Sequence, residues 1–195
     1  MTPQTGKSSF QTILDTAEEL IREKGCRQTT LQDIIRRSGL SKGAIYHYVS
    51  SKDELLGLVM KSRIEQLNAR FTEAVNSPQS RGLHNPLQLI AEGMVRNTSH
   101  EDVTNRIFLY LLSQMDNETV AATVKEVYQY TLQTCTKWIE AGQQHGVIPP
   151  DTDKARIAEM LVMFMYGLRV QNTILQEPSG MKAEDLIRFM AKALS

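Results

Sequence analysis

The positions of the prolines constrain the fold of this chain more than any other feature. Its six prolines stand at 3, 78, 86, 149, 150 and 178, so long stretches contain no residue that breaks a helix. Those stretches repeat apolar residues three and four positions apart, as between Phe10 and Ile21. No segment alternates apolar and polar residues as a half-buried strand does. The sequence therefore predicts an all-α chain of about nine helices.

Two short helices are expected close together near the front of the chain. Thr30 and Asp33 form an acidic variant of a capping box ahead of a helix over 31–38. The turn SGLS joins it to a second helix over 42–49, which is the helix-turn-helix pattern. Six apolar residues are expected to face inward: Leu31, Ile34, Ile35, Leu40, Ile45 and Val49.

Longer amphipathic helices follow this front region. The expected spans are 52–76, 86–96, 101–113, 116–145, one from 151 or 153 to 176, and 183–194. A small helical head on a larger helical body is the expected shape. We therefore place a first domain at 1–51, with its helix-turn-helix motif at about 31–50, and a second domain at 52–195.

Charge is neutral overall but uneven along the chain. Lysine and arginine total 22, as do aspartate and glutamate, which gives a formal net charge of zero. Between residues 27 and 52, however, the sequence contains five basic residues and a single acidic one, Asp33. A local basic patch on a neutral protein fits either a nucleic-acid contact or a solvated face, and charge alone leaves both open.

The sequence lacks the signatures of several other classes of protein. Cys26 and Cys135 lie far apart and form no metal-binding or disulfide pattern, so we expect free structural thiols and no cofactor. No catalytic motif is present, which argues against an enzyme. The longest apolar run, 160–166, is too short to cross a bilayer, and the N-terminus does not resemble a signal peptide. A cytoplasmic protein without membrane partners is expected.

The second short helix carries an unusual strip of residues. Lys42 and Tyr46, like Gly43 and His47, stand four positions apart and therefore share a face away from Ile45. A lysine suits phosphate, a glycine lets the backbone approach closely, and the two rings can donate hydrogen bonds and pack on sugars. We predict that this strip contacts DNA. Tyr48 lies beside the strip and can either contact DNA or pack inward.

The stretch TTLQDIIRRSGLSKGAIYHYVSSKDEL resembles the DNA-binding signature of the tetracycline-repressor (TetR) family of bacterial regulators. The resemblance extends from about Phe10 to Leu55, roughly a quarter of the chain. One departure is visible, because Val49 stands where the family usually has phenylalanine. A smaller or repacked head core is expected there.

The resemblance implies a transcriptional repressor that binds double-stranded DNA as a homodimer, with its two heads in successive major grooves of a palindromic operator. It also implies a small-molecule effector that releases the protein. A TetR-like protein without an effector, acting through a protein partner or constitutively, is the alternative. The DNA contacts carried over are Thr30, Ser41, Lys42, Gly43, Tyr46, His47, Tyr48 and Lys52.

In that family the body holds a ligand cavity, and methionines and aromatics are the candidates to line it with apolar surface. The predicted ligand-binding residues are Met94, Phe108, Leu111, Met115, Tyr128, Met163 and Tyr166. Plain core packing is the alternative for each of them. Arg169 can meet an acidic ligand group or pair with an acidic neighbour, and the pairing is the expectation.

The last two helices are apolar on more than one face, which indicates a dimer contact of four helices, two from each subunit. Closing the core of a single subunit is the alternative. The predicted interface residues are Ala158, Leu161, Val162, Met165, Leu168, Leu186, Ile187 and Met190. The operator, the regulated genes, the effector and the sign of regulation lie beyond the sequence.

Overall fold

A computed structural model describes residues 8–76, 84–176 and 180–194 of the chain, and in that part every regular element is a helix. The all-α prediction is confirmed. The helices in order are α1 (Ser9–Gln28), α2 (Leu31–Ser38), α3 (Lys42–Tyr46), α4 (Lys52–Asn76), α5 (His84–Asn97), α6 (Val103–Leu112), α7 (Glu118–Gln144), α8 (Lys154–Leu175) and α9 (Ala183–Ala193).

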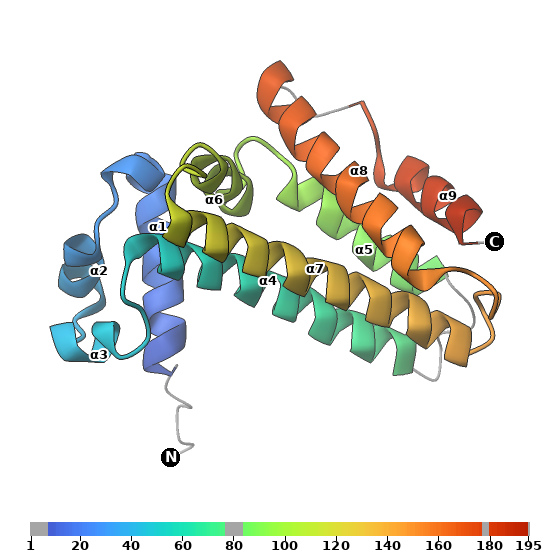
Figure 1. Cartoon of the computed structure of the whole chain (residues 1–195), viewed down its shortest axis with the longest axis horizontal. Coiled ribbons are helices and arrows are strands. Elements are labelled where there is room, and N and C mark those ends of the chain that lie inside the picture. Colours follow the sequence, from blue (N-terminus) through green and yellow to red (C-terminus); the bar gives the residue numbers. More distant parts are fainter. Residues whose placement is uncertain (1–7, 77–83, 177–179, 195) are drawn as a thin grey trace, which may run out of the picture.

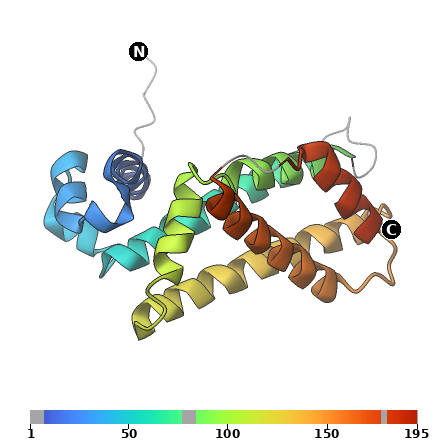
Figure 2. The ribbon, with the colours of Figure 1, turned by 90° about the horizontal axis from the view of Figure 1, so that it is seen from above.

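The helices form a small head at one end of an elongated body (Figure 1). Helices α1, α2 and α3 make the head, and α4 leads from it along the body beside α7. Helices α5, α8 and α9 pack at the far end, where the last described residues lie (Figure 2). Helix α6 packs against α1 and α4, where head meets body.

Polar caps fix the start of several helices where the sequence indicates. The capping box of α2 is confirmed, since Thr30 Oγ1 accepts the amide of Asp33 while Asp33 Oδ2 accepts that of Thr30. Ser51 Oγ accepts the amide of Glu54 at the start of α4, and Asp153 caps α8 by accepting the amide of Arg156. Each bond satisfies an amide that has no partner within its helix.

Helix α3 is shorter than predicted, ending at Tyr46 instead of 49. The amide of Tyr48 bonds to the carbonyl of Ile45, three residues back, so the last turn tightens and the chain leaves the helix. Glycines interrupt the neighbouring helices: Gly39, at a φ of 69°, ends α2, and Gly25, at 78°, kinks α1 shortly before its end at Gln28.

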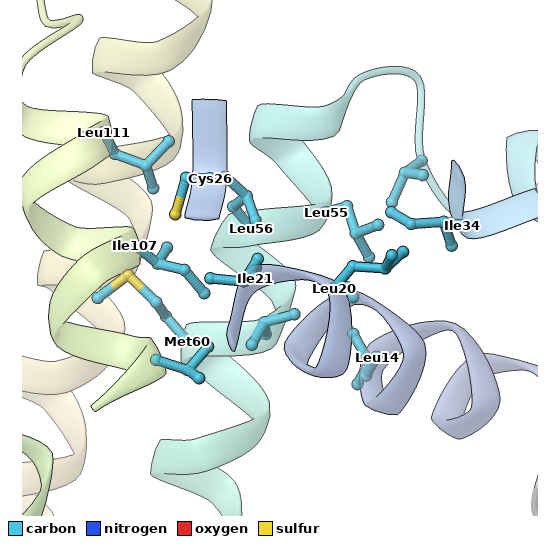
Figure 3. Close-up of a cluster of buried hydrophobic side chains, with 14 of the residues drawn as sticks. Leu14, Leu20, Ile21, Cys26, Ile34, Leu55, Leu56, Met60, Ile107 and Leu111 are labelled. Atoms are coloured by element: carbon cyan, nitrogen blue, oxygen red, sulfur yellow. The ribbon is translucent and has the colours of Figure 1, made fainter. Parts of the chain in front are cut away.

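One apolar cluster joins the head to the body (Figure 3). Leu14 and Ile21 of α1, Ile34 of α2 and Leu55 of α4 are buried in the same cluster as Ile107 of α6. Burial of this surface stabilises both the head and its attachment. The head therefore shares its core with the body, and a division at residues 51 and 52 remains a proposal about function.

Candidate DNA-binding surface and ligand cavity

Helix α3 presents the predicted strip to solvent. Ile45 is fully buried, which turns the opposite face of this one-and-a-half-turn helix outward. Lys42, Gly43, Tyr46 and His47 are all exposed, and Tyr46 keeps 46% of its surface accessible. His47 continues in helical conformation, with its amide bonded to the carbonyl of Gly43. The structure thus brings these four residues together on one surface.

Lys42 is held along this surface by its neighbour. Its Nζ lies 5.5 Å from the centre of the Tyr46 ring, within the range of a cation–π contact. Among the residues that the structure describes, no carboxylate forms an ion pair with it. Its positive charge is therefore free for a phosphate.

Tyr48 does more packing than the strip residues. Its ring lies 5.2 Å from that of Phe10 in α1 and 5.1 Å from that of His47, measured between ring centres. Val49 beside it is buried in the head core. Tyr48 thus braces His47 against α1 and remains half-exposed.

Two other predicted DNA contacts are placed differently from the strip. Thr30 is exposed at the start of α2, but its hydroxyl serves the capping box. Lys52 turns inward, because its Nζ donates to the carbonyl of Cys26 at 3.1 Å and lies 4.7 Å from the centre of the Tyr110 ring. The structure does not bring Lys52 into the strip. Ser41 stays at the surface and caps α3.

The basic patch is also smaller than the sequence count indicates. Arg37 makes two bonds, of 2.6 and 2.8 Å, to the carboxylate of Glu23 in α1, and Arg36 pairs with Asp33 at 2.7 Å. The hydrogen bond from Arg37 lowers the pKa of Glu23. Glu23 lies outside the counted window, so the sequence alone did not reveal this neutralisation.

The body encloses an apolar cavity of about 360 Å³. Its walls come from α4, α5, α7, α8 and α9, with Thr104 added from α6. The volume falls within the range of pockets that hold small molecules. Wall residues that were not predicted from the sequence include Ile64, Leu67 and Phe71 of α4 with Thr134, Cys135 and Trp138 of α7. The three-and-four spacing of the α4 residues was the available signal.

The predicted ligand-binding residues divide among four places. Met94 and Tyr166 line the cavity. Phe108, Met115 and Tyr128 line a separate outer groove between α6, α7 and α8, which Tyr166 also borders. Leu111 is buried in the cluster between head and body, and Met163 is exposed on α8, so neither lines the cavity or the groove. For these two the prediction was wrong, because spacing alone does not say which face of a helix meets which neighbour.

Known proteins resemble this chain in both parts. The family model described as bacterial regulatory proteins, tetR family, matches residues 13–59, which include α2, α3 and the strip. Residues 13–59 therefore belong to the DNA-binding region of the TetR family of transcriptional regulators. The N-terminal signature, predicted from the residues between Phe10 and Leu55, is thereby confirmed.

Curated TetR-family relatives extend the similarity into the body. The transcriptional regulator UidR of Escherichia coli K12 is 27% identical over 178 residues, covering 90% of this chain and 83% of its own. The transcriptional repressor KstR2 of Rhodococcus jostii is 29% identical over 155 residues, or 76% and 72% of the two chains. Both relatives are transcriptional regulators.

Solved structures show that the fold is shared over the whole length. GusR of Salmonella enterica superposes with a TM-score of 0.61 at 20% identity, covering 98% of this chain and 99% of its own. The complex of SmeT with triclosan gives a TM-score of 0.64 at 18% identity, covering 96% and 91%. At such identities the likeness establishes the fold alone.

Most of the predicted dimer residues lie inside the helical body. Ala158, Leu186 and Met190 are almost completely buried in the subunit, in one cluster with Leu161 and Leu168. Val162 is also buried, and Met165 and Ile187 pack against that cluster. The six buried residues hold α8 and α9 to their own subunit, so their assignment to an interface was wrong. Met165 and Ile187 are only partly buried, and their place in an interface stays a prediction.

The outer face of α8 carries a different apolar stripe. Met163 and Ile174 are 57% and 73% exposed. The stripe repeats at three and four positions and consists of Met160, Met163, Gly167, Val170 and Ile174. Most of the α8 residues predicted for the interface lie on the opposite, inner face, since both faces of α8 are apolar and only packing distinguishes them.

The remaining expectations concern thiols, metals and membranes. Burial raises the pKa of Cys26 to about 11 and that of Cys135 to about 12, so both stay protonated and poorly reactive at neutral pH. Over the described ranges no group of histidine, cysteine or acidic residues is arranged to hold a metal ion. None of the helices there combines the length and apolarity that crossing a bilayer requires.

Proposed function

We propose that this protein is a TetR-family repressor that binds a palindromic operator as a homodimer and leaves it when a hydrophobic small molecule enters the body. The exposed strip of Lys42, Gly43, Tyr46 and His47 carries the proposal. A lysine free of acidic partners beside two half-packed rings is suited to phosphates and base edges in a major groove.

The strip is suited to contribute more to DNA affinity than to discrimination between base sequences. Lys42 contributes a charge to phosphate, and Tyr46 and His47 can donate hydrogen bonds to the DNA backbone. Apart from its own helix and chain neighbours, a Cβ at Gly43 would meet only Ser41 Oγ, 4.0 Å away, so the glycine leaves the backbone open to close approach. Binding of this kind releases counterions and weakens steeply with salt.

Selection from a random pool of double-stranded DNA identifies the operator, and mobility shift then measures the affinity of variants for it. Lys42→Ala and Tyr46→Ala are expected to weaken operator binding at least ~10-fold with unchanged thermal unfolding, because both side chains are exposed. Lys137→Ala removes an equally exposed charge from α7 and serves as the control. Wild-type operator affinity in both head variants contradicts the proposal.

The proposed dimer uses the outer face of α8 with the exposed Phe189 of α9. The ring of Phe189 stacks on Phe164 at 4.7 Å between centres, which fixes its position at the surface. Gly167 has open space where a Cβ would stand, so a second helix can approach closely there. A dimer sets the distance between the two heads, and an operator of matching half-site spacing then binds both.

The proposed effector site is the cavity of about 360 Å³. The triclosan complex of SmeT supports a small-molecule effector for this fold. A ligand that favours a head separation unsuited to the operator lowers DNA affinity by the difference in its binding to the two states. Helix α4 belongs to the cavity wall and begins at the head, so it is the proposed route.

A further inference from the structure

One charged side chain has no partner inside the cavity wall. Arg169 of α8 is only 6% exposed and lines the cavity of about 360 Å³. Its Nε and Nη1 are buried and make no hydrogen bond. Its guanidinium lies 5.3 Å from the centre of the Phe108 ring, which offers a cation–π contact and no acceptor. The expected pairing of Arg169 with an acidic neighbour is wrong for the described residues.

The two groups that act electrostatically on Arg169, Asp102 and Tyr166, each interact with another residue. Asp102 attracts Arg169 from a distance, but its carboxylate caps α6 by accepting the amide of Thr104 at 2.8 Å. The phenol of Tyr166 interacts with Thr131. No carboxylate of the described residues lies within ion-pair distance of Arg169.

An unpaired buried guanidinium is costly for a protein to keep. Burial lowers the pKa of Arg169, yet an arginine remains protonated, so its charge persists inside the apolar wall. Buried charges are ordinarily paired, and leaving one unpaired destabilises the folded state. An acceptor that enters the cavity and pairs with the guanidinium removes that penalty on binding.

We propose that Arg169 is an anion-binding subsite of the cavity, and that the effector is an amphipathic anion with an apolar body and a single carboxylate or similar group. A planar carboxylate can accept two parallel bonds from a guanidinium, which is a strong and directional pairing. The apolar walls from α4, α5 and α7 receive the rest of the molecule. This inference rests on the proposed effector site and assigns its ligand class.

Matched pairs of probes test the charge requirement on the full-length protein. Decanoate and decanamide differ at one end only, as do 2-naphthoate and 2-naphthamide, and two scaffolds separate charge from shape. Calorimetry without DNA should show that at least one carboxylate binds ~10-fold or more tightly than its amide. Equal affinity within both pairs, or no binding of any probe, overturns the inference.

Substitution of the arginine gives a second, independent measurement. Arg169→Met removes the unpaired charge, so the ligand-free protein is expected to melt at a higher temperature while the preference for carboxylate over amide disappears. Arg156→Met, at an exposed position near the start of α8, should change neither property. A lower melting temperature together with retained preference overturns the subsite. The wild-type probe pairs decide the matter even if Arg169→Met fails to fold.

The outcomes for ligand class and for effector response are separable. If carboxylates bind with the stated preference but leave operator binding unchanged, the anion subsite stands and the proposed release from DNA fails. If a neutral ligand binds the cavity and releases the operator while no carboxylate is preferred, the effector response stands and the anion subsite fails. Mobility shift on the selected operator, with and without each probe, distinguishes these cases.

Discussion

At the scale of single residues, Asp33 organises the front of the head. Its Oδ2 accepts from Lys24 Nζ at 2.6 Å and from the hydroxyl of Thr30 at 2.7 Å, while Oδ1 accepts from Arg36. The hydrogen bonds from Lys24 and Thr30 hold its pKa far below the ordinary value of 3.8. The carboxylate that begins α2 also ties that helix to α1.

The depressed pKa makes head stability depend on pH in a defined direction. The ionised form is favoured in the folded state, so the stabilisation is complete above the ordinary pKa of 3.8 and is lost as the pH falls through the folded value. We expect Asp33→Asn to melt below wild type at neutral pH, with the difference shrinking as the pH falls below about 4. Melting temperatures from circular dichroism measure this.

Asp116→Asn is the matched control, since Asp116 is exposed and accepts no hydrogen bond from the described residues. It should leave the melting temperature unchanged at each pH. A difference between wild type and Asp33→Asn that stays constant into acid would show that the carboxylate stabilises the head by something other than its charge.

At the scale of elements, α8 has two apolar faces with different roles. The face with Ala158 and Leu161 packs within the subunit, while the face with Met163 and Ile174 is exposed. An exposed apolar stripe along a helix of 22 residues indicates a protein partner. A second copy of α8 is the proposed partner because the stripe repeats as a helix–helix seam does.

Met163→Glu is expected to convert the dimer to a monomer. A carboxylate placed in the centre of an apolar seam would be buried without a partner, which destabilises association by about 3–5 kcal/mol, or ~100-fold or more in the dissociation constant. Sedimentation velocity at micromolar concentration measures the change. Val95→Glu alters an exposed apolar residue of α5 and should leave the dimer intact. A wild-type monomer at this concentration would contradict the proposed interface.

At the scale of the whole molecule, one ion pair links the cavity to the head. Glu18 of α1 is buried and accepts from Arg63 of α4, which lines the cavity. Arg22 of α1 bonds to the same carboxylate at 3.2 Å. A ligand that moves Arg63 therefore acts directly on the first helix of the head.

Loss of the Glu18–Arg63 ion pair should reduce the effect of the ligand on operator affinity more than it reduces ligand binding itself. We expect Glu18→Gln to reduce the ligand-induced drop in operator affinity ~2–30-fold, the range for residues that carry coupling between sites. Mobility shift with and without the tightest-binding probe measures the drop. Arg22→Gln is the control, because it keeps the Arg63 pair. An unchanged drop in Glu18→Gln would place the coupling elsewhere along α4.

The head could be predicted closely from the sequence because its signals are local. The capping box at Thr30, the glycine after α2 and the four-residue spacing of the strip each depend on neighbours a few positions away. The end of α3 and the inward turn of Lys52 were not predictable in this way. Lys52 points to a carbonyl 26 residues earlier in the chain, which the local pattern does not contain.

The body was less predictable because its assignments depend on which helix faces meet. Helix positions followed from periodicity, but α8 is apolar on two sides and its hydropathy does not say which side is covered. Arg169 illustrates the same limit, since its sequence neighbourhood suggested an acidic partner and the packed helices supply none among the described residues.

The sequence by itself determined that the chain is helical, where most helices begin, and which residues of α3 point away from the head core. Those properties depend on backbone hydrogen bonding and on side-chain spacing within one helix. Only the tertiary structure decided that Arg37 is neutralised by Glu23, that the inner face of α8 belongs to its own subunit, and that Arg169 stands unpaired in a cavity wall. Each of these depends on contacts between helices far apart in the sequence. Burial and distance then determine the interaction energy of the charged groups.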